Sequence, residues 1–174
     1  MAMRLDLLSI LIVEDVAPMR QLLMAILSAL GVGTILSAAS GDEGFDIFCN
    51  ETPDIVITDW HMEPGDGIEL TQKIRTSPLS PNKTAPVIML TGFSALKKIE
   101  QSRDAGVTEY LSKPFTAEKL IKRITHVIEN PRDFILTASY FGPDRRRREL
   151  TGYSGPYRRA ADTSVDMNDV VLVG

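Results

Sequence analysis

Several polar side chains in this sequence come directly after short apolar runs, and Asp59 is the clearest of them. It follows the run Ile55-Val56-Ile57-Thr58, and turn-forming Pro, Gly and Asp residues come next at 64–67. A short apolar run bounded by turn residues is typical of a strand buried on both faces of a parallel sheet. Such strands present polar chemistry at their carboxyl ends, where the loops bind ligands. Taken alone, Asp59 is explained equally well as a turn cap, so the other strand ends decide its role.

The same arrangement recurs three more times along the chain. Glu14 and Asp15 follow the apolar run at 8–13, Thr91 follows the run at 86–90, and Lys113 follows the short expected strand at 109–112. The carboxyl ends of parallel strands meet at one edge of a sheet, so we expect these side chains to converge on Asp59. Two carboxylates about 4 Å apart repel by roughly 4 kcal/mol at an effective dielectric constant near 20. The cluster therefore predicts either raised pKa values or a bound cation, and its oxygen ligands suit Mg²⁺.

These residue types together favour phosphoryl transfer. A divalent cation, the Lys113 ammonium and the Thr91 hydroxyl would surround one nucleophilic carboxylate, that of Asp59. Asp59 would attack phosphorus and become an acyl phosphate, while the cation and Lys113 neutralise charge on the phosphoryl oxygens. Each residue has an ordinary alternative: Asp15 as a helix cap, Thr91 as a turn residue, Lys113 as a solvated loop lysine. Their joint occurrence at successive strand ends is what favours the chemical interpretation.

Positioning these side chains requires a regular alternation of strands and helices, and the sequence predicts one. Expected strands cover 8–13, 34–38, 55–58, 86–90 and 109–112, and expected helices cover 17–30, 41–50, 68–76, 94–105 and 116–129, the last two counted from their capping residues Ser94 and Thr116. Strands separated by helices imply right-handed crossovers and a parallel sheet. We therefore predict an α/β fold, a five-stranded, doubly wound parallel sheet with helices on both faces.

Composition limits the class of protein. The chain has 174 residues, 44% of them hydrophobic and 24% charged, which is ordinary for a globular protein. A net charge of −4 argues against wholesale nucleic-acid binding. The single cysteine, Cys49, lies in an apolar helical stretch, so we expect a buried, unreactive thiol and a reducing compartment. Asp6 interrupts the N-terminal apolar run, and no stretch reaches the roughly 18 apolar residues of a membrane span, so we expect a cytoplasmic protein without membrane contact.

Residues 6–129 resemble the CheY-like receiver domain of two-component response regulators. The motifs that carry the resemblance are Ile12-Val13-Glu14-Asp15, Asp59-Trp60-His61-Met62, Asp66-Gly67, Thr91-Gly92 and Tyr110-Leu111-Ser112-Lys113-Pro114-Phe115. The resemblance implies a flavodoxin-like sheet with strand order 2-1-3-4-5. Residues 130–174 would then be a C-terminal extension containing Arg, Gly and Pro.

The resemblance also implies a role for each residue of the acidic cluster. Asp59 is the phosphoacceptor, receiving phosphate from a sensor histidine kinase or a phosphotransfer protein. Asp15, Asp59 and the backbone carbonyl of His61 bind Mg²⁺, and Glu14 contacts the metal through water.

For the remaining motifs the resemblance implies a switch. Lys113 pairs with the phosphoryl group, and the peptide bond before Pro114 is cis. Thr91 hydrogen-bonds a phosphoryl oxygen, and Tyr110 turns inward when Thr91 moves. Phosphorylation adds about −1.5 to −2 charges at one point, enough to bias such a two-state element toward binding a downstream protein that the sequence does not identify.

Two positions beside the site depart from the usual pattern or vary within it. Gly92 stands where the family usually has alanine. Phe93 lies where dephosphorylation is tuned, and we hypothesise that this bulky ring shields the phosphoryl group from water.

The extension has a distinct composition. Residues 140–160 contain six arginines against two acidic residues, and the segment 140–146 returns at 153–159 as a near repeat. Each copy presents an aromatic residue, a Gly-Pro pair and two arginines, namely Arg145 and Arg146 in the first copy and Arg158 and Arg159 in the second. Paired guanidinium groups recognise phosphate, acidic protein surfaces or RNA. The simpler interpretation is an extension that is partly disordered or docked on the receiver, whose residues 1–129 carry a net charge of −5.

Three functions stay open at this stage. A receiver that binds a protein partner when phosphorylated fits best. A nucleic-acid-binding regulator that uses the arginine-rich extension is the alternative and is not favoured by the overall charge. A dedicated phosphohydrolase fits least, because such enzymes usually carry a second aspartate two residues after the nucleophile, where this chain has His61.

Overall fold

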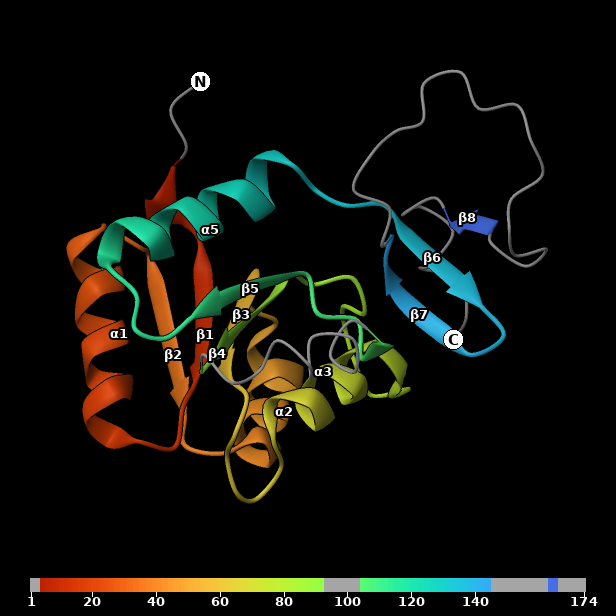
Figure 1. Ribbon diagram of the computed structural model, residues 1–174, viewed down its shortest axis with the longest axis horizontal. Helices are drawn as coiled ribbons and strands as arrows, with labels where there is room; N and C mark the ends of the chain where they lie inside the picture. The colour runs from red at the N-terminus through yellow and green to blue at the C-terminus, as the bar shows by residue number, and fades with distance from the viewer. Residues whose placement is uncertain (1–3, 93–103, 145–162, 166–174) are drawn as a thin grey trace.

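A computed structural model describes residues 4–92 and 104–144 and the backbone of 163–165 (Figure 1). In chain order the elements are the short 3-10 helix η1 (Leu5–Leu7), β1 (Ser9–Val13), α1 (Ala17–Ala29), β2 (Thr34–Ala38), α2 (Gly41–Glu51), β3 (Ile55–Asp59), α3 (Gly67–Thr76), β4 (Val87–Thr91), β5 (Glu109–Ser112), α5 (Ala117–Glu129), β6 (Phe134–Thr137), β7 (Tyr140–Pro143) and β8 (Thr163–Val165). The helix expected at 94–105 lies outside the described residues except for its last two positions, and so does Phe93.

The main sheet has the predicted architecture. Its five strands lie in the order β2-β1-β3-β4-β5, and every neighbouring pair is parallel. The order implied by the family resemblance is therefore confirmed. The interior strand β4 is buried at all five positions, which explains why its sequence is an apolar run rather than an alternating pattern.

Two hydrophobic layers hold helices on both faces of this sheet. Successive strand residues point to opposite faces. Ile10 and Ile12 of β1 pack in one layer with residues of α1 and α5, whereas Leu11 and Val13 pack in the other with residues of α2 and α3. Figure 1 shows the corresponding separation of α1 and α5 from α2 and α3.

Side-chain caps begin three of the helices. Ser40 accepts a hydrogen bond from the Glu43 N–H at the start of α2, and Asp66 accepts one from Glu69 at the start of α3. Thr116 caps α5, as predicted. Such caps satisfy backbone donors that have no partner within the helix.

Some expected boundaries and one expected burial were wrong. β3 includes Asp59, and β4 extends to Thr91. β4 begins at Val87 rather than Pro86 because Pro86 has no N–H to donate to the ladder. Cys49 is half-buried rather than buried: its thiol donates to the Leu79 carbonyl at 3.5 Å, while Phe48 occupies the core position beside it.

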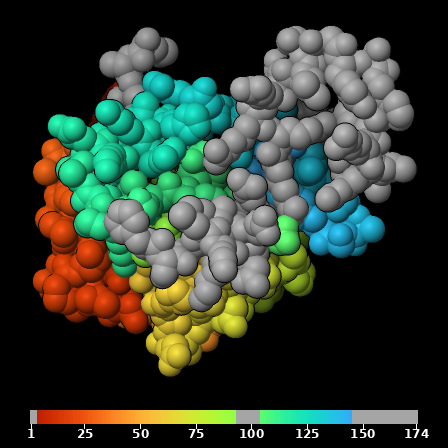
Figure 2. Space-filling view, in the orientation of Figure 1, coloured from red at the N-terminus to blue at the C-terminus, as the bar shows by residue number. Residues whose placement is uncertain are grey.

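The extension contributes an antiparallel hairpin that the sequence analysis missed. β6 pairs with β7 from Phe134↔Pro143 to Thr137↔Tyr140, and β8 pairs with the other edge of β6. Phe134 is buried, and its ring lies 5.6 Å from that of Phe141. In Figure 2 the blue hairpin adjoins the rest of the described molecule. The paired arginines at 145, 146, 158 and 159 lie outside the described residues. Within the part of the chain that is described, no helix is both long and apolar enough to cross a membrane.

Candidate metal centre and active site

Three carboxylates meet at the carboxyl ends of β1 and β3. Glu14 and Asp15 follow β1 directly, and Asp59 is the last residue of β3, its neighbour in the sheet. One oxygen from each carboxylate lies within 4.8 Å of the others. Glu14 is fully buried, Asp59 is partly buried and Asp15 is exposed. The predicted convergence of these three residues is therefore present in the structure.

Lys113 completes the cluster from the edge strand β5. It follows β5, and its Nζ lies 2.9 Å from Glu14 Oε2 and 3.0 Å from Asp59 Oδ1. Its backbone N–H donates to the carbonyl of Thr91, the last residue of β4, at 2.6 Å. The Lys113–Pro114 peptide bond is cis, as the resemblance implied. The backbone of Lys113 is thus held by Thr91 of β4, and its side chain is held by the two carboxylates.

Burial and charge act in opposite directions within this group. Burial raises the pKa of Glu14, although its hydrogen bond with Lys113 opposes the shift. Burial alone would lower the pKa of Lys113, but its hydrogen bonds with Glu14 and Asp59 outweigh that effect and raise the pKa above its ordinary value. Lys113 is consequently charged at neutral pH. One ammonium against three carboxylates leaves an excess of negative charge that a divalent cation would neutralise.

The donor set fits Mg²⁺. The ligands are hard oxygens, and Mg²⁺ holds oxygens at about 2.1 Å in an octahedron, which places ligand atoms about 3 to 4 Å apart. One carboxylate oxygen from each of Glu14, Asp15 and Asp59 lies within 4.8 Å of the others, a separation close to that range. Asp15, being exposed, leaves room for the waters that Mg²⁺ retains. His61 lies two residues beyond Asp59, in the loop that follows β3, and the role of its carbonyl as a ligand stays a prediction.

The structure adds one residue that the sequence analysis did not single out, Arg20, and gives a physical reason for Gly67 of the Asp66-Gly67 motif. Arg20 of α1 donates to the carbonyls of Glu14 at 2.6 Å and Asp15 at 3.4 Å, which fixes the backbone that presents both carboxylates. Gly67 donates its N–H to the Trp60 carbonyl, and a Cβ at this position would overlap the Asp59 carbonyl. Glycine is therefore required there. An arginine on the first turns of the helix that follows an acidic pair is the signal that could have revealed Arg20.

The two expected switch residues lie near the site. Thr91 is nearly buried, and its register partner on β5 is Ser112. Tyr110 is half-buried and packs against a small cluster of Trp60, Met89 and Val107. Because Trp60 follows Asp59 directly, this cluster connects Tyr110 to the acidic site. The inward turn of Tyr110 stays a prediction.

Comparison with known proteins agrees with this geometry. A family model of the response regulator receiver domain matches residues 10–125. The chain belongs to this family. These residues form a receiver domain of the two-component response regulators. The family is one of signalling proteins rather than dedicated enzymes. Receiver domains take phosphate from histidine kinases. The acidic cluster of Glu14, Asp15 and Asp59 is typical of the Mg²⁺ site of receiver domains.

Individual relatives support the assignment. The chain is 32% identical to the chemotaxis protein CheY homolog of Campylobacter jejuni over 122 residues. This match covers 70% of this chain and 92% of that protein. It is 34% identical to the transcriptional regulatory protein PdtaR of Mycobacterium tuberculosis over 124 residues. This match covers 71% of this chain and 58% of PdtaR.

Solved structures show the same fold. The chemotaxis protein CheY4 of Vibrio cholerae matches with a TM-score of 0.63 and 28% identity, over 69% of this chain and 98% of that one. The receiver domain of a histidine kinase from Syntrophus aciditrophicus matches with a TM-score of 0.65 and 27% identity, over 71% and 92% of the two chains. The similarity accounts for the receiver and leaves much of the extension unmatched.

Proposed function

We propose that this receiver accepts a phosphoryl group on Asp59 from a sensor histidine kinase or a phosphotransfer protein, and that the modified chain binds a downstream protein. The observation that supports this proposal most strongly is the position of Lys113. Its ammonium lies 3.0 Å from Asp59 Oδ1, in the same group as the Glu14 and Asp15 carboxylates. The nucleophilic oxygen of Asp59 thus lies beside one fixed positive charge, the Lys113 ammonium, and beside carboxylates that could bind a metal cation.

The transfer is a displacement at phosphorus. An oxygen of Asp59 attacks the phosphorus of a phosphohistidine, the P–N bond breaks, and its electron pair returns to the imidazole nitrogen. The new O–P bond makes an acyl phosphate, and Asp59 acts once per transfer, as an acceptor rather than a catalyst. Asp15, Asp59 and the His61 carbonyl would hold Mg²⁺, with Glu14 contacting it through water. The bound ion would neutralise charge on the phosphoryl oxygens. Lys113 pairs with one of those oxygens once transfer has occurred.

Thr91 and Tyr110 would convert the modification into a new surface. The phosphoryl group brings three strong acceptors to the edge of the sheet where β4 ends. The Thr91 hydroxyl would move to donate to one of them, and the Tyr110 ring would fill the space that Thr91 leaves. The change alters the face around β5 and α5, where a protein partner would bind.

Intact mass measurement tests the proposed chemistry. The full chain is incubated with acetyl phosphate and Mg²⁺, beside the variants Asp59→Asn and Asp54→Asn. Asp54 is a suitable control because it lies just before the same strand, where its carboxylate accepts from the Ser9 N–H at 2.8 Å. We expect one added phosphoryl group on the wild type and on Asp54→Asn, and none on Asp59→Asn. An Asp59→Asn chain that gains the same mass would refute the proposal.

A second candidate function is nucleic-acid binding by the arginine-rich extension. It is favoured by the six arginines at 140–160 and by the transcriptional regulator among the relatives. Substituting glutamine at 145, 146, 158 and 159 should then abolish an electrophoretic shift with RNA or DNA. In the wild type that shift should weaken steeply as salt rises, because phosphate contacts release counterions.

A further inference from the structure

The short strand β5 is anchored by charge at both of its ends. Lys113 comes immediately after its last residue and pairs with Glu14 and Asp59. Glu109 is its first residue, and the Glu109 side chain is almost fully buried. A four-residue strand is only about 13 Å long. The active-site ammonium and a buried carboxylate therefore stand at the two ends of one short, rigid element.

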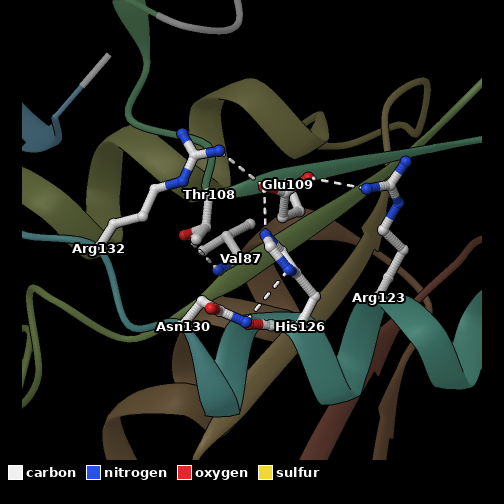
Figure 3. Close-up of polar contacts among 7 residues, drawn as sticks. All are labelled: Val87, Thr108, Glu109, Arg123, His126, Asn130 and Arg132. Carbon is white, nitrogen blue, oxygen red and sulfur yellow. Dashed lines mark hydrogen bonds and ion pairs between the residues drawn. The ribbon is translucent and has the colours of Figure 1, made fainter. Parts of the chain in front are cut away.

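Three cationic or titratable side chains converge on Glu109 (Figure 3). Arg132 Nη2 lies 2.8 Å from Glu109 Oε1, Arg123 Nη1 lies 3.3 Å from Oε2, and His126 Nε2 lies 3.7 Å from Oε1. Arg123 and His126 belong to α5, whereas Arg132 belongs to the extension. A buried carboxylate is strongly destabilising unless it is paired. The link between α5 and the hairpin is consequently fastened to β5.

The hairpin has a second attachment just upstream of the same strand. Arg75 of α3 is fully buried, and its guanidinium donates to the carbonyls of Gly106 at 3.0 Å and Lys83 at 2.8 Å. A longer contact of 3.5 Å reaches the Thr108 hydroxyl. The Phe134 ring of β6 covers this guanidinium, with its centroid 5.1 Å from Cζ.

Backbone approaches backbone at the same place. Gly142 of β7 lies so close to Gly106 that a Cβ would come within 2.9 Å of the Gly106 Cα and would also overlap the Tyr140 hydroxyl. The hairpin is therefore fitted closely to the residues that lead into β5. A two-stranded hairpin has little stability of its own in water, so its order depends on these contacts.

We propose that the hairpin of β6 and β7 senses the phosphorylation state of Asp59, because its docking is linked through β5 to the charges around Lys113. This inference rests on the proposed function. A phosphoryl group on Asp59 changes the partners of Lys113, and the ladder with β4 carries the adjustment along β5 to Glu109 and thus to Arg132. Linkage is reciprocal, so the same coupling lets docking of the hairpin bias the site. The extension is then an output element of this receiver.

Hydrogen exchange of the full chain tests the proposal. Exchange of the β6 and β7 amides is measured with and without acetyl phosphate and Mg²⁺, and intact mass is recorded on the same samples. We expect the exchange rates to change by about fivefold or more, the lower end of typical coupling between sites. The Asp59→Asn chain should show no change. A chain that gains the phosphoryl group with unchanged hairpin exchange overturns this inference alone, whereas a chain that gains none overturns the proposed function and this inference with it.

Two matched variants test the route through Glu109. Arg132→Gln removes the partner that the extension supplies, whereas Arg123→Gln removes a partner on α5 and leaves the extension attached. We expect Arg132→Gln to lose the phosphorylation-dependent difference and Arg123→Gln to keep it. The route is refuted if Arg132→Gln keeps the full difference or if both variants lose it equally.

Discussion

Lys113 illustrates, at the scale of single residues, how stability and function share one contact. Its ammonium lies between a fully buried carboxylate, Glu14, and the proposed acceptor, Asp59. Lys113 Nζ lies 2.9 Å from the Glu14 carboxylate, whereas the hydrogen bond from Arg20 goes to the Glu14 backbone carbonyl. The same charge that would neutralise a phosphoryl oxygen therefore also compensates a buried acid before any phosphate arrives.

The substitution Lys113→Ala should destabilise the metal-free protein by about 3 kcal/mol, because it leaves Glu14 buried without its cationic partner. Urea unfolding in the presence of a chelator measures the loss. Lys119→Ala, at an exposed position on α5, is the control and should change the free energy of unfolding by less than about 0.5 kcal/mol. Saturating Mg²⁺ should reduce the difference between Lys113→Ala and the wild type. Equal losses for the two variants would contradict the role given to Lys113.

Cys49 gives a prediction about pH. Burial raises the pKa of its thiol, and the nearby charge of Asp46 raises it further. Because the thiolate is the reactive form, alkylation of the folded protein at pH 8 should be slower than alkylation of a free cysteine. The rate should continue to rise above the ordinary thiol pKa of about 8.5, where the rate for free cysteine levels off. A rate profile that levels off at or below that pH would show that the thiol is not shielded.

At the scale of elements, one of the contacts that hold the hairpin to the receiver is the Phe134 ring over the buried Arg75 cation. Burial lowers the pKa of Arg75 to about 9, and the group is still protonated at neutral pH. A buried guanidinium needs acceptors for its donors and a cover that excludes water from its face. The carbonyls of Gly106 and Lys83 supply the acceptors, and Phe134 supplies the cover.

Phe134→Ala should therefore destabilise the protein by about 3 kcal/mol, the low end for truncating a buried phenylalanine. Leu136→Ala is a close control, because Leu136 lies on the same strand with half of its side chain exposed. It should cost less than about 0.5 kcal/mol. Thermal unfolding of the two variants makes the comparison, and similar losses would show that the ring over Arg75 is not what holds the hairpin.

The elements also show what a sequence can predict. Strands β1, β3 and β4 of the main sheet are largely apolar runs, and all five strands alternate with helical patterns, so both the sheet and the convergence of Asp59, Glu14 and Lys113 could be predicted. The hairpin could not, because β6 and β7 are four residues each and depend on contacts with Arg75 and Gly106, which are distant in sequence. Arg75 itself resembles an ordinary surface cation in the last turn of a helix. Only the fold shows that it is buried.

At the scale of the whole molecule, the acidic site and the hairpin lie at opposite ends of the strands of one sheet. The acidic site occupies the carboxyl ends of β1 and β3 together with Lys113, whereas the hairpin contacts residues that precede β5 and the end of α3. β5 runs from one region to the other. The extension is therefore attached far from the chemistry but on an element that participates in it.

Truncation separates these two regions. A chain that ends at Asp144 keeps the hairpin, whereas one that ends at Glu129 loses Phe134 and Arg132 and leaves Arg75 and Glu109 without those partners. We expect the shorter chain to melt about 10 °C lower than the longer one, taking about 3 kcal/mol for the buried ring and about 3 °C for each kcal/mol. Calorimetry measures both chains. Equal melting temperatures would mean that the hairpin adds nothing to the receiver.

Locating the phosphoryl group within the chain tests the central claim most directly. The phosphorylated full-length protein is reduced with borohydride, which converts an aspartyl phosphate to homoserine, and its peptides are then sequenced by mass spectrometry. The geometry of Lys113, Glu14 and Asp15 around one oxygen predicts homoserine at position 59 and an unmodified aspartate at position 15. Modification at any other residue, or a phosphorylated chain in which residue 59 is still aspartate, would contradict the account.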